Sequence, residues 1–578
     1  MKKLSGLSTA LAAVLLLGSL AGCGGKDKDG DKNNDADKPT KQEETEKETE
    51  KKEEDNKDDE GDAPDEVIEL TFFNRDGQED PWTDPVALEI TEKTGIKLKT
   101  SYPLDENDES IDLMIAEQNY PDLIYAKGGA GKLIEAGALI DLEPLIDEYG
   151  PNIKKMYGEE LDKLRHSQED PAIYQLSSYE VGGRSYTTSG VAQIQWAVLK
   201  ENGYEVPQTL ADYEKMIKDY LADNPQTEDG QDRIGLTLST ADWHWFITLS
   251  NPSGFIGEAQ PDNGQWLVDE NNQAMYKFRS DKVREYMRWL NKMYHEGVLD
   301  PDFATQTHED YIAKIATGRV VAITDAEWDY ADAEKILRAD GKLEQTYAPL
   351  PITLEADQKC PSLMYQGLTT GWGVGITTSC EDPVAAIKYI DFICSDEGQV
   401  LVHWGLEDVN YTVEDGKRIM NPEDRKMKNE DPDYGKKTGV GFHGSPFPIY
   451  GNGVEDPTGN TYTTASKENV IQEYHEEQQA AVDAWGVELL TDIFPQPEEF
   501  EVPKFSAIWA YAKPVEFDEI ANQLDEIAWP SLVEMIIDDA ENFDGHYDLM
   551  IEELEGVGMT EAEEMLTDII AERVALVE

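Results

Sequence analysis

The stretch VIELTFFNRDGQEDPWTDPVALEITEKTGIKLKTSYP, residues 67–103, decides the fold of this chain. It predicts a strand over 67–73, rich in β-branched and aromatic residues, then a helix that ends at Gly95, then a second strand. The alternation repeats with a helix at SIDLMIAEQ (110–118) and a strand at PDLIYA (121–126). Such a βαβαβ start predicts a parallel sheet with helices on its faces.

The rest of the chain keeps this α/β character. Strands are predicted at IGLTL, RVVAIT (319–324) and TGWGVGIT (370–377), and helices at TLADYEKMIKDYLAD (209–223) and DPVAAIKYIDFICS (382–395). About 510 residues follow residue 66, too many for one hydrophobic core, so we expect two or more lobes. Open parallel sheets bind ligands beyond the carboxyl ends of their strands, which places the Asn74–Trp82 loop near any ligand.

The N-terminus has the order of a secretory signal. Lys2 and Lys3 precede an apolar run from Leu7 to Leu20, and a small-residue site ends in Cys23. The sequence Leu20-Ala21-Gly22-Cys23 resembles the lipobox of bacterial lipoproteins. That resemblance implies a signal peptide over 1–22 and a lipid-modified Cys23 that anchors the protein to the extracytoplasmic face of the cell membrane. The alternative is an ordinary secreted protein in which this cysteine occurs by chance.

Residues 24–66 contain no aromatic residue and no Leu, Ile, Val or Met, while Lys, Asp and Glu dominate. Such a segment cannot bury enough apolar surface to offset the entropy of ordering it. Its excess of acids favours an extended chain by self-repulsion. We therefore predict that residues 23–66 are a disordered acidic linker between the lipid and the folded body.

Composition excludes several classes of function. The chain has 50 Lys plus Arg against 120 Asp plus Glu, a net charge of −70, which repels nucleic acid and anionic headgroups.

Cys360, Cys380 and Cys394 are predicted to be thiols, with a Cys360–Cys380 or Cys380–Cys394 disulfide as the alternative. We predict no metal and no cofactor, because there is no HExxH and the loop 223–235 lacks calcium ligands at the required spacing. No G-x-S-x-G is present, and we predict that the protein is not an enzyme.

Several collinear segments resemble extracellular solute-binding proteins of bacterial ABC importers, closest to the large sugar-binding lipoprotein subgroup. They are PDLIYA, LIDLEPLIDEYGPNI (139–153), VPQTLADYEKMIKDY (206–220), LNKMYHEGVLDPDFAT (290–305), IATGRVVAI (315–323), PVAAIKYIDFICSDEGQVLVHWG (383–405) and FDGHYDLMIEELEGVGMTEAEEML (543–566).

The resemblance implies a type II periplasmic-binding-protein-like fold, α/β, with two discontinuous lobes, a hinge and an interlobe ligand cleft. By this analogy lobe 1 comprises residues 67–185 plus about 325–380. Lobe 2 comprises about 186–324 plus 381–578, including the C-terminal helices. We expect a monomer that delivers an oligosaccharide to the transmembrane subunits of an ABC permease.

Tryptophans in polar surroundings are the candidate ligand contacts, because flat aromatic faces can stack on the C–H faces of sugar rings. Trp328 ranks first and Trp372 second, since Gly371 and Gly373 would let a ligand approach the backbone. The other candidates are Trp243, Trp245 and Trp82. Trp243 and Trp245 share a face only in an extended segment, whereas in a helix only one could touch ligand. The competing interpretation of each is a core aromatic.

Polar contacts to sugar hydroxyls are predicted near the same places. The candidates are Asn74, Arg75, Asp76, Asp122, Asp325, Glu327, Arg184 and Tyr186. Asp122 has an alternative role as a helix or loop cap. The sequence thus predicts capture of an oligosaccharide without conversion. The alternatives are the same fold with a peptide or other nutrient, a surface sensor or adhesion lipoprotein without a permease, and a surface-anchored glycosidase.

Overall fold

The first sheet forms where the sequence predicts it. The computed structural model describes residues 67–577, apart from 104–108 and 189. The five-stranded sheet has the order β2-β1-β3-β12-β4, made of β1 (Ile68–Asn74), β2 (Ile96–Ser101), β3 (Leu123–Tyr125), β4 (Leu176–Ser177) and β12 (Gly373–Ile376). β1 pairs in parallel with β2 and β3, whereas β12 is antiparallel to both β3 and β4.

Helix α1 shows how local chemistry sets these elements. Asp84 caps its N-terminus by accepting a hydrogen bond from the backbone N–H of Ala87, and Pro85 opens the helix. Gly95 closes it with a φ of 71°, as the sequence predicts. The helices of this part are α1 (Pro85–Thr94), α2 (Glu109–Glu117), α3 (Ala130–Glu135), α4 (Glu143–Tyr149), α5 (Pro151–Tyr157), α11 (Pro383–Ile393) and α12 (Asp396–Trp404).

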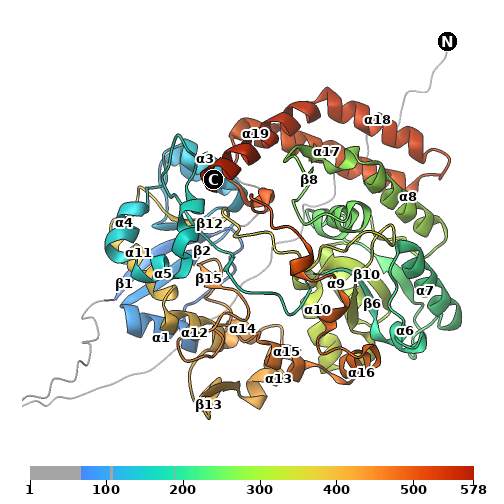
Figure 1. Cartoon of the computed structure of the whole chain (residues 1–578), viewed down its shortest axis with the longest axis horizontal. Coiled ribbons are helices and arrows are strands. Elements are labelled where there is room, and N and C mark those ends of the chain that lie inside the picture. The colour runs from blue at the N-terminus through green and yellow to red at the C-terminus, as the bar shows by residue number, and fades with distance from the viewer. Residues whose placement is uncertain (1–66, 104–108, 189, 578) are drawn as a thin grey trace, which may run out of the picture. The chain divides into compact units, whose positions relative to one another are not determined.

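The second sheet has the order β11-β6-β10-β7. Its strands are β6 (Gly190–Gln195), β7 (Ile234–Thr237), β10 (Val320–Ala326) and β11 (Tyr347–Leu350). β10 is parallel to β7 and antiparallel to β6, which is also antiparallel to β11. Around it lie α6 (Trp196–Glu201), α7 (Leu210–Asp223), α8 (Asp281–His295), α9 (His308–Ala316) and α10 (Glu327–Ala339). Figure 1 shows β2 and β12 in one group of elements and β6 and β10 in another.

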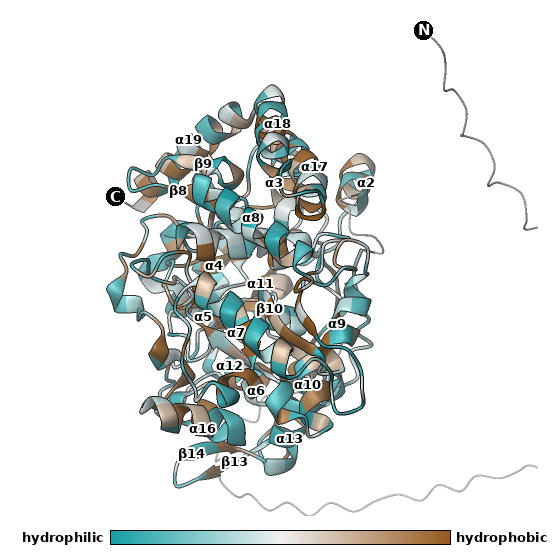
Figure 2. Ribbon diagram, turned by 90° about the vertical axis from the view of Figure 1, so that its right-hand side faces the viewer, coloured by the Kyte–Doolittle hydropathy of each residue, from teal (hydrophilic) through white to brown (hydrophobic). Residues whose placement is uncertain are grey.

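Each sheet has its own hydrophobic core. The larger core contains the inner faces of β6, α7, α8 and the C-terminal helices α17 (Val515–Ile537), α18 (Phe543–Gly556) and α19 (Met559–Val577). Figure 1 shows α17 and α18 running beside α8. The outward faces of α7 and α8 are hydrophilic while β10 is hydrophobic (Figure 2). Among the described residues, no helix combines the length and apolarity needed to span a membrane.

Strand pairing corrects the predicted lobe bounds. β11 falls within the range 325–380 assigned to lobe 1, yet it pairs with β6 in the second sheet. α11 and α12 fall within the range 381–578 assigned to lobe 2, yet Ile387, Ile390 and Val402 pack in the core of the first sheet. These helices carry apolar faces that fit either sheet, so only the tertiary packing assigns them.

The remaining elements lie between α12 and the C-terminal helices. β13 (Tyr411–Glu414) and β14 (Lys417–Met420) form a hairpin, and β15 (Ile449–Tyr450) pairs with β5 (Glu180–Val181). The helices here are α13 (Pro422–Glu430), α14 (Tyr434–Thr438), α15 (Lys467–Glu473) and α16 (Glu476–Trp485). A short hairpin of β8 (Trp266–Val268) and β9 (Ala274–Tyr276) contacts α19.

Candidate functional site

The carboxyl edges of the two sheets are joined by the same connecting segments. β4 ends beside the start of β12, at the edge where β1 and β3 also end. β6 begins at the edge where β7, β10 and β11 end. The chain therefore passes from one carboxyl edge to the other between β4 and β6, and again between β11 and β12. These edges are where an open α/β sheet binds its ligand.

Two exposed tryptophans mark the edge of the second sheet. Trp243 follows β7 and is 41% exposed, and Trp328 follows β10 and is 59% exposed. Their rings are nearly parallel, with a 10° angle between planes and centroids 6.2 Å apart. All twelve tryptophans lie in the described part of the chain, and the other ten are buried or half-buried there. Apolar area of this kind, exposed on neighbouring rings, is typical of a binding surface.

Two histidines stack against Trp243 of this indole pair, one behind the other. Trp243 stacks on His244 at a centroid distance of 3.9 Å, and His244 stacks on His308 at 3.6 Å. We call Trp243, His244, His308 and Trp328 the second-sheet aromatic group. Glu327 keeps access to solvent, but the surrounding protein removes enough of its water to raise its pKa to about 7.

A second set of aromatics lies at the edge of the first sheet. Trp372 precedes β12 and makes an edge contact with Trp509 at 4.6 Å, and Trp509 makes another with Tyr179 at 5.3 Å. We call these three residues the first-sheet aromatic group. The ammonium of Lys127 lies 4.6 Å from the centroid of the Trp372 ring and pairs with Asp76 at 2.6 Å. A cation over an indole face is favourable, and more so where water is excluded.

Trp509 comes from the C-terminal part of the chain and is hydrogen-bonded to the segment that precedes β8. Its Nε1 donates to the backbone oxygen of Asp262 at 3.2 Å. Trp372 Nε1 is buried and has no hydrogen-bond partner in the structure. A buried indole N–H without an acceptor costs free energy, which a bound hydroxyl could recover.

The predicted residues Asn74, Arg75 and Asp76 do follow β1 at the carboxyl edge of the first sheet. The Asn74 side chain accepts a hydrogen bond from the backbone N–H of Asp76 at 3.1 Å, which shapes the turn. Arg75 is half-buried, and its backbone N–H donates to Tyr125. Of the three, Asp76 presents a carboxylate that is half exposed beside Lys127.

Arg184 and Tyr186 lie together on the connection between β5 and β6. The Arg184 guanidinium is 5.8 Å from the centroid of the Tyr186 ring, and its Nη2 donates to Gln496 at 3.3 Å. Arg184 is exposed and Tyr186 half-buried, so both remain candidate rim contacts.

Two predicted tryptophans pack inside the cores. Trp245 is 2% exposed and lies parallel to Trp529 at 6.1 Å, because residues 243–245 form a tight turn and not an extended segment. Of the two geometries considered for this pair, the structure has the one in which a single indole faces solvent. Trp82 is 8% exposed and its Nε1 donates to Thr91 at 2.8 Å. Both indoles are thus buried in the cores, and their contact with a ligand stays a prediction.

Two predicted acids have partners within the protein. Asp122 directly precedes β3, where the sequence places it, and its carboxylate accepts hydrogen bonds from the backbone N–H and hydroxyl of Thr71. This contact joins β1 to the segment that precedes β3, and it is neither a helix cap nor a loop cap. Asp325 is 2% exposed and accepts from the Tyr311 hydroxyl at 2.6 Å. Burial raises the pKa of Asp325 well above its ordinary value, and the neighbouring Asp329 carboxylate adds to the rise.

The glycines around Trp372 serve packing and not ligand access. A Cβ on Gly371 would lie 1.5 Å from the backbone oxygen of Ala510, and one on Gly373 would lie 2.3 Å from that of Leu176. Protein backbone therefore fills the space that the sequence argument reserved for ligand. The close approach at Gly371 brings the Trp509 segment against Trp372.

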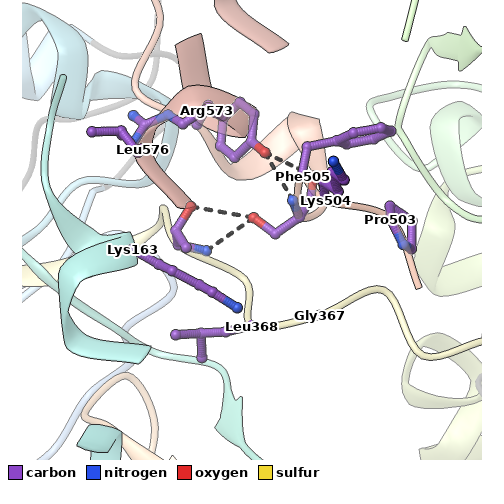
Figure 3. A pocket seen from close by; sticks show the side chains of 11 residues that line it. Lys163, Gly367, Leu368, Pro503, Lys504, Phe505, Arg573 and Leu576 are labelled. Atoms are coloured by element: carbon purple, nitrogen blue, oxygen red, sulfur yellow. Dashed lines mark hydrogen bonds between the residues drawn. The ribbon is translucent and has the colours of Figure 1, made fainter. Parts of the chain in front are cut away.

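A small pocket adjoins this junction without using any predicted site residue. It lies where the segments around Leu368 and Phe505 meet the end of α19, and Lys163, Lys504 and Arg573 contribute its cations (Figure 3). The Ser506 hydroxyl and the Thr370 side chain lie 3.2 Å apart across it, and the Tyr511 hydroxyl donates to the Ser506 backbone oxygen. These hydrogen bonds fix the Trp509 segment against the connection between β11 and β12.

Sequence reasoning missed the residues that only folding brings to the site. Tyr179, Trp509, Lys127, His308 and Asp329 come from separate segments, and no motif links them. Position was a usable signal for two of them, since Lys127 and Tyr179 lie two residues after the ends of β3 and β4.

Residues 86–407 match the family model of the bacterial extracellular solute-binding proteins. The chain belongs to this family. Lipoprotein LipO of Bacillus subtilis (strain 168) is 21% identical over 350 residues, which cover 58% of this chain and 66% of LipO. The fructooligosaccharide ABC transporter substrate-binding protein FusA of Streptococcus pneumoniae serotype 4 is 23% identical over 245 residues, 41% of this chain and 45% of FusA. The chain thus aligns with just under two thirds of LipO and less than half of FusA.

Solved structures show the same fold. The alginate-binding protein AlgQ2 without calcium ion superposes with a TM-score of 0.63 at 17% identity, covering 88% of this chain and 99% of that one. FusA in complex with kestose gives 0.62 at 16%, with the same coverage. A solute-binding protein from Bifidobacterium longum subsp. infantis gives 0.64 at 15%, covering 88% and 98%. The predicted type II periplasmic solute-binding fold is confirmed.

Proposed function

We propose that this protein captures an oligosaccharide at the carboxyl edges of its two sheets and delivers it, unconverted, to the membrane subunits of an ABC importer. The observation that carries the proposal is the exposed, nearly parallel pair Trp243 and Trp328 at the edge of the second sheet. Flat apolar faces of this kind suit the C–H faces of sugar rings. Family membership supports the role of a binding protein, and the relative FusA carries a fructooligosaccharide name.

Polar groups suited to hydroxyls surround both aromatic groups. Glu327 adjoins Trp328 in sequence, and Asp76 and Lys127 adjoin Trp372 in space. Carboxylates accept and ammonium groups donate, so together they can pair with hydroxyls that do both. The net charge of the whole chain, −70, disfavours an anionic ligand, and we therefore propose a neutral oligosaccharide.

Closure would follow from the connections between the two carboxyl edges. A ligand that touches both edges stabilises the closed arrangement over the open one by its differential affinity. We propose that the protein acts as a monomer, with its lobes moving about the connections between β4 and β6 and between β11 and β12.

Anchoring is a separate part of the proposal and falls outside the described residues. We propose that the signal over 1–22 is removed, that Cys23 is lipidated, and that residues 23–66 tether the body to the extracytoplasmic face of the membrane. Cys23→Ser should release the protein into the medium of an expressing bacterium, and it should abolish incorporation of a labelled fatty acid. Retention of the label by the variant would contradict the anchor.

The binding function is tested by titrating the protein with a panel of neutral oligosaccharides, acidic oligosaccharides and peptides. Saturating ligand at 100 times its Kd stabilises the native state by about 2.7 kcal/mol, which a melting curve detects. We expect a neutral oligosaccharide to raise the Tm and to be recovered intact. Stabilisation by peptides alone would overturn the sugar proposal, and a shortened sugar would identify a glycosidase.

A further inference from the structure

Two histidines and an aspartate converge beneath the exposed indole pair. His244 lies in the turn after β7, His308 opens α9, and Asp329 lies in the first turn of α10. Asp329 Oδ1 is 3.3 Å from His308 Nε2 and 3.7 Å from His244 Nε2. One ligand atom from each residue lies within 4.8 Å of the other two.

These separations suit a tetrahedral metal ion. Zinc binds imidazole nitrogen at about 2.0–2.1 Å and carboxylate oxygen at about 2.0–2.2 Å, so two tetrahedral ligand atoms lie roughly 3.3–3.5 Å apart. The two nitrogen-to-oxygen distances bracket that value. The imidazole rings are stacked with a 2° angle between planes, so metal binding requires them to open until both in-plane lone pairs converge.

The site places one buried carboxylate against two imidazoles. His244 Nδ1 lies 2.5 Å from Asp242 Oδ1, a contact that places the proton on Nδ1 and leaves a lone pair on Nε2 facing Asp329. Asp329 is 9% exposed and its side chain 3%; its carboxylate interacts with that of Asp325, and its Oδ2 accepts no hydrogen bond from a protein donor. His308 Nδ1 is likewise buried without a partner. A cation held by the two Nε2 atoms and the Asp329 carboxylate would balance the charge of that buried carboxylate, and His308 Nδ1 would then carry the imidazole proton.

Asp242 contacts the ring nitrogen of His244 that would not bind the metal. A metal-bound histidine usually donates its other ring N–H to a carboxylate, which fixes the tautomer and the ring orientation. The His244–Asp242 contact has this arrangement already. Asp242 is therefore a positioning residue.

We propose that His244 Nε2, His308 Nε2 and an Asp329 carboxylate oxygen bind one divalent transition-metal ion of the zinc type, with a fourth position left for water or a ligand hydroxyl. This inference goes beyond the proposed function, since it holds whatever the organic ligand is. Trp243 stacks directly on His244, so metal loading also positions the exposed indole pair.

The test uses the full chain, stripped with a chelator and titrated with ZnCl2 by calorimetry. We expect one ion per chain, and Co2+ in its place should give the visible absorption of a four-coordinate site. His308→Asn and Asp329→Asn should each lower the zinc affinity by at least a hundredfold, and Asp242→Asn by about 10–100-fold. Melting curves without metal establish that each variant is folded.

The control is the other cluster of this composition in the described part of the chain, Asp80, Asp84 and His443. His443→Asn should leave zinc affinity and stoichiometry unchanged. The inference is overturned if His443→Asn abolishes binding, if His308→Asn does not weaken it, or if no ion binds. Should a variant fail to fold, X-ray absorption at the zinc edge of the unaltered protein decides, because a shell without imidazole nitrogen would also overturn it.

The two proposals fail separately. Zinc binding without oligosaccharide binding would support this inference and contradict the proposed function. Oligosaccharide binding by a chain that takes up no zinc would support the proposed function and contradict the metal site.

Discussion

Trp243 and Trp328 lie nearly parallel, 6.2 Å between ring centroids, although one follows β7 and the other follows β10. Because β7 and β10 run parallel and end at the same edge, the sheet itself brings the two indoles together. Both are exposed, Trp243 at 41% and Trp328 at 59%, unlike the ten other tryptophans of the chain. This relationship separates the indoles that can meet a ligand from those that stabilise the cores.

Replacing either exposed indole by alanine should weaken oligosaccharide binding by about tenfold or more, corresponding to about 1.4 kcal/mol or more. Trp243→Ala and Trp328→Ala should leave the Tm of the free protein nearly unchanged, because little buried contact is lost. Trp328→Phe is the matched control, since it keeps a flat face. Calorimetry on the three variants measures the effect, and equal affinity in Trp328→Ala would remove this residue from the site.

Replacing a core indole should give the opposite pattern. Trp245→Ala should lower the free energy of unfolding by about 3–5 kcal/mol, because it leaves a cavity beside Trp529 and Phe278. Trp82→Ala should behave likewise and also remove the hydrogen bond that Trp82 Nε1 donates to the Thr91 hydroxyl. Denaturant melts measure the loss, and the oligosaccharide affinity of the folded fraction should be unchanged. A specific loss of affinity would show that these indoles do reach the ligand.

Trp372→Phe tests the unpartnered indole N–H. In the free protein the change should cost little, since Nε1 makes no hydrogen bond and the Phe ring keeps the contact with Trp509. We expect weaker ligand binding, by about tenfold, if a sugar hydroxyl accepts from Nε1 in the complex. Paired Tm and affinity measurements distinguish these effects, and a large fall in Tm with normal affinity would indicate a purely structural indole.

Asp525 on α17 should make stability depend on pH. Burial raises its pKa from 3.8 to about 7, even though it accepts hydrogen bonds from Tyr276 and Gln265. Between about pH 4 and pH 7 the folded state therefore holds a proton that the unfolded state has released, so this group's contribution falls as pH rises through that window. Below about pH 4 the Asp525 carboxyl is protonated in both the folded and the unfolded state, so its burial costs no ionisation energy. Above about pH 7 the loss of folding stability from burying this carboxyl is complete.

Asp525→Asn should remove that component. Its Tm should drop less than that of the parent between pH 5 and pH 8, and the variant should be the more stable protein at pH 8. Glu526→Gln, an exposed neighbour on the same helix, is the control and should follow the parent. An identical pH profile for Asp525→Asn and the parent would contradict the assigned pKa.

Local chemistry made much of the fold predictable. The strand 67–73, the helix closed by Gly95, and the strands at RVVAIT and TGWGVGIT all form close to their predicted positions, because caps, glycines and β-branched runs act over a few residues. The sequence predicted less well which sheet each element joins, because the apolar faces of β11 and α11 would fit either core. The partners of Asp122 and Asp325 were not predictable, because a carboxylate beside a strand looks the same in sequence whether Thr71, Tyr311 or a ligand satisfies it.

By itself the sequence determined the alternation of strands and helices, the family and the candidate edge, since these depend on patterns within short segments. Only the tertiary structure decided which tryptophans stay exposed, which glycines meet backbone, and which histidines meet Asp329. The physical reason is that burial and side-chain partners depend on contacts between residues far apart in the chain, and no local pattern records those contacts.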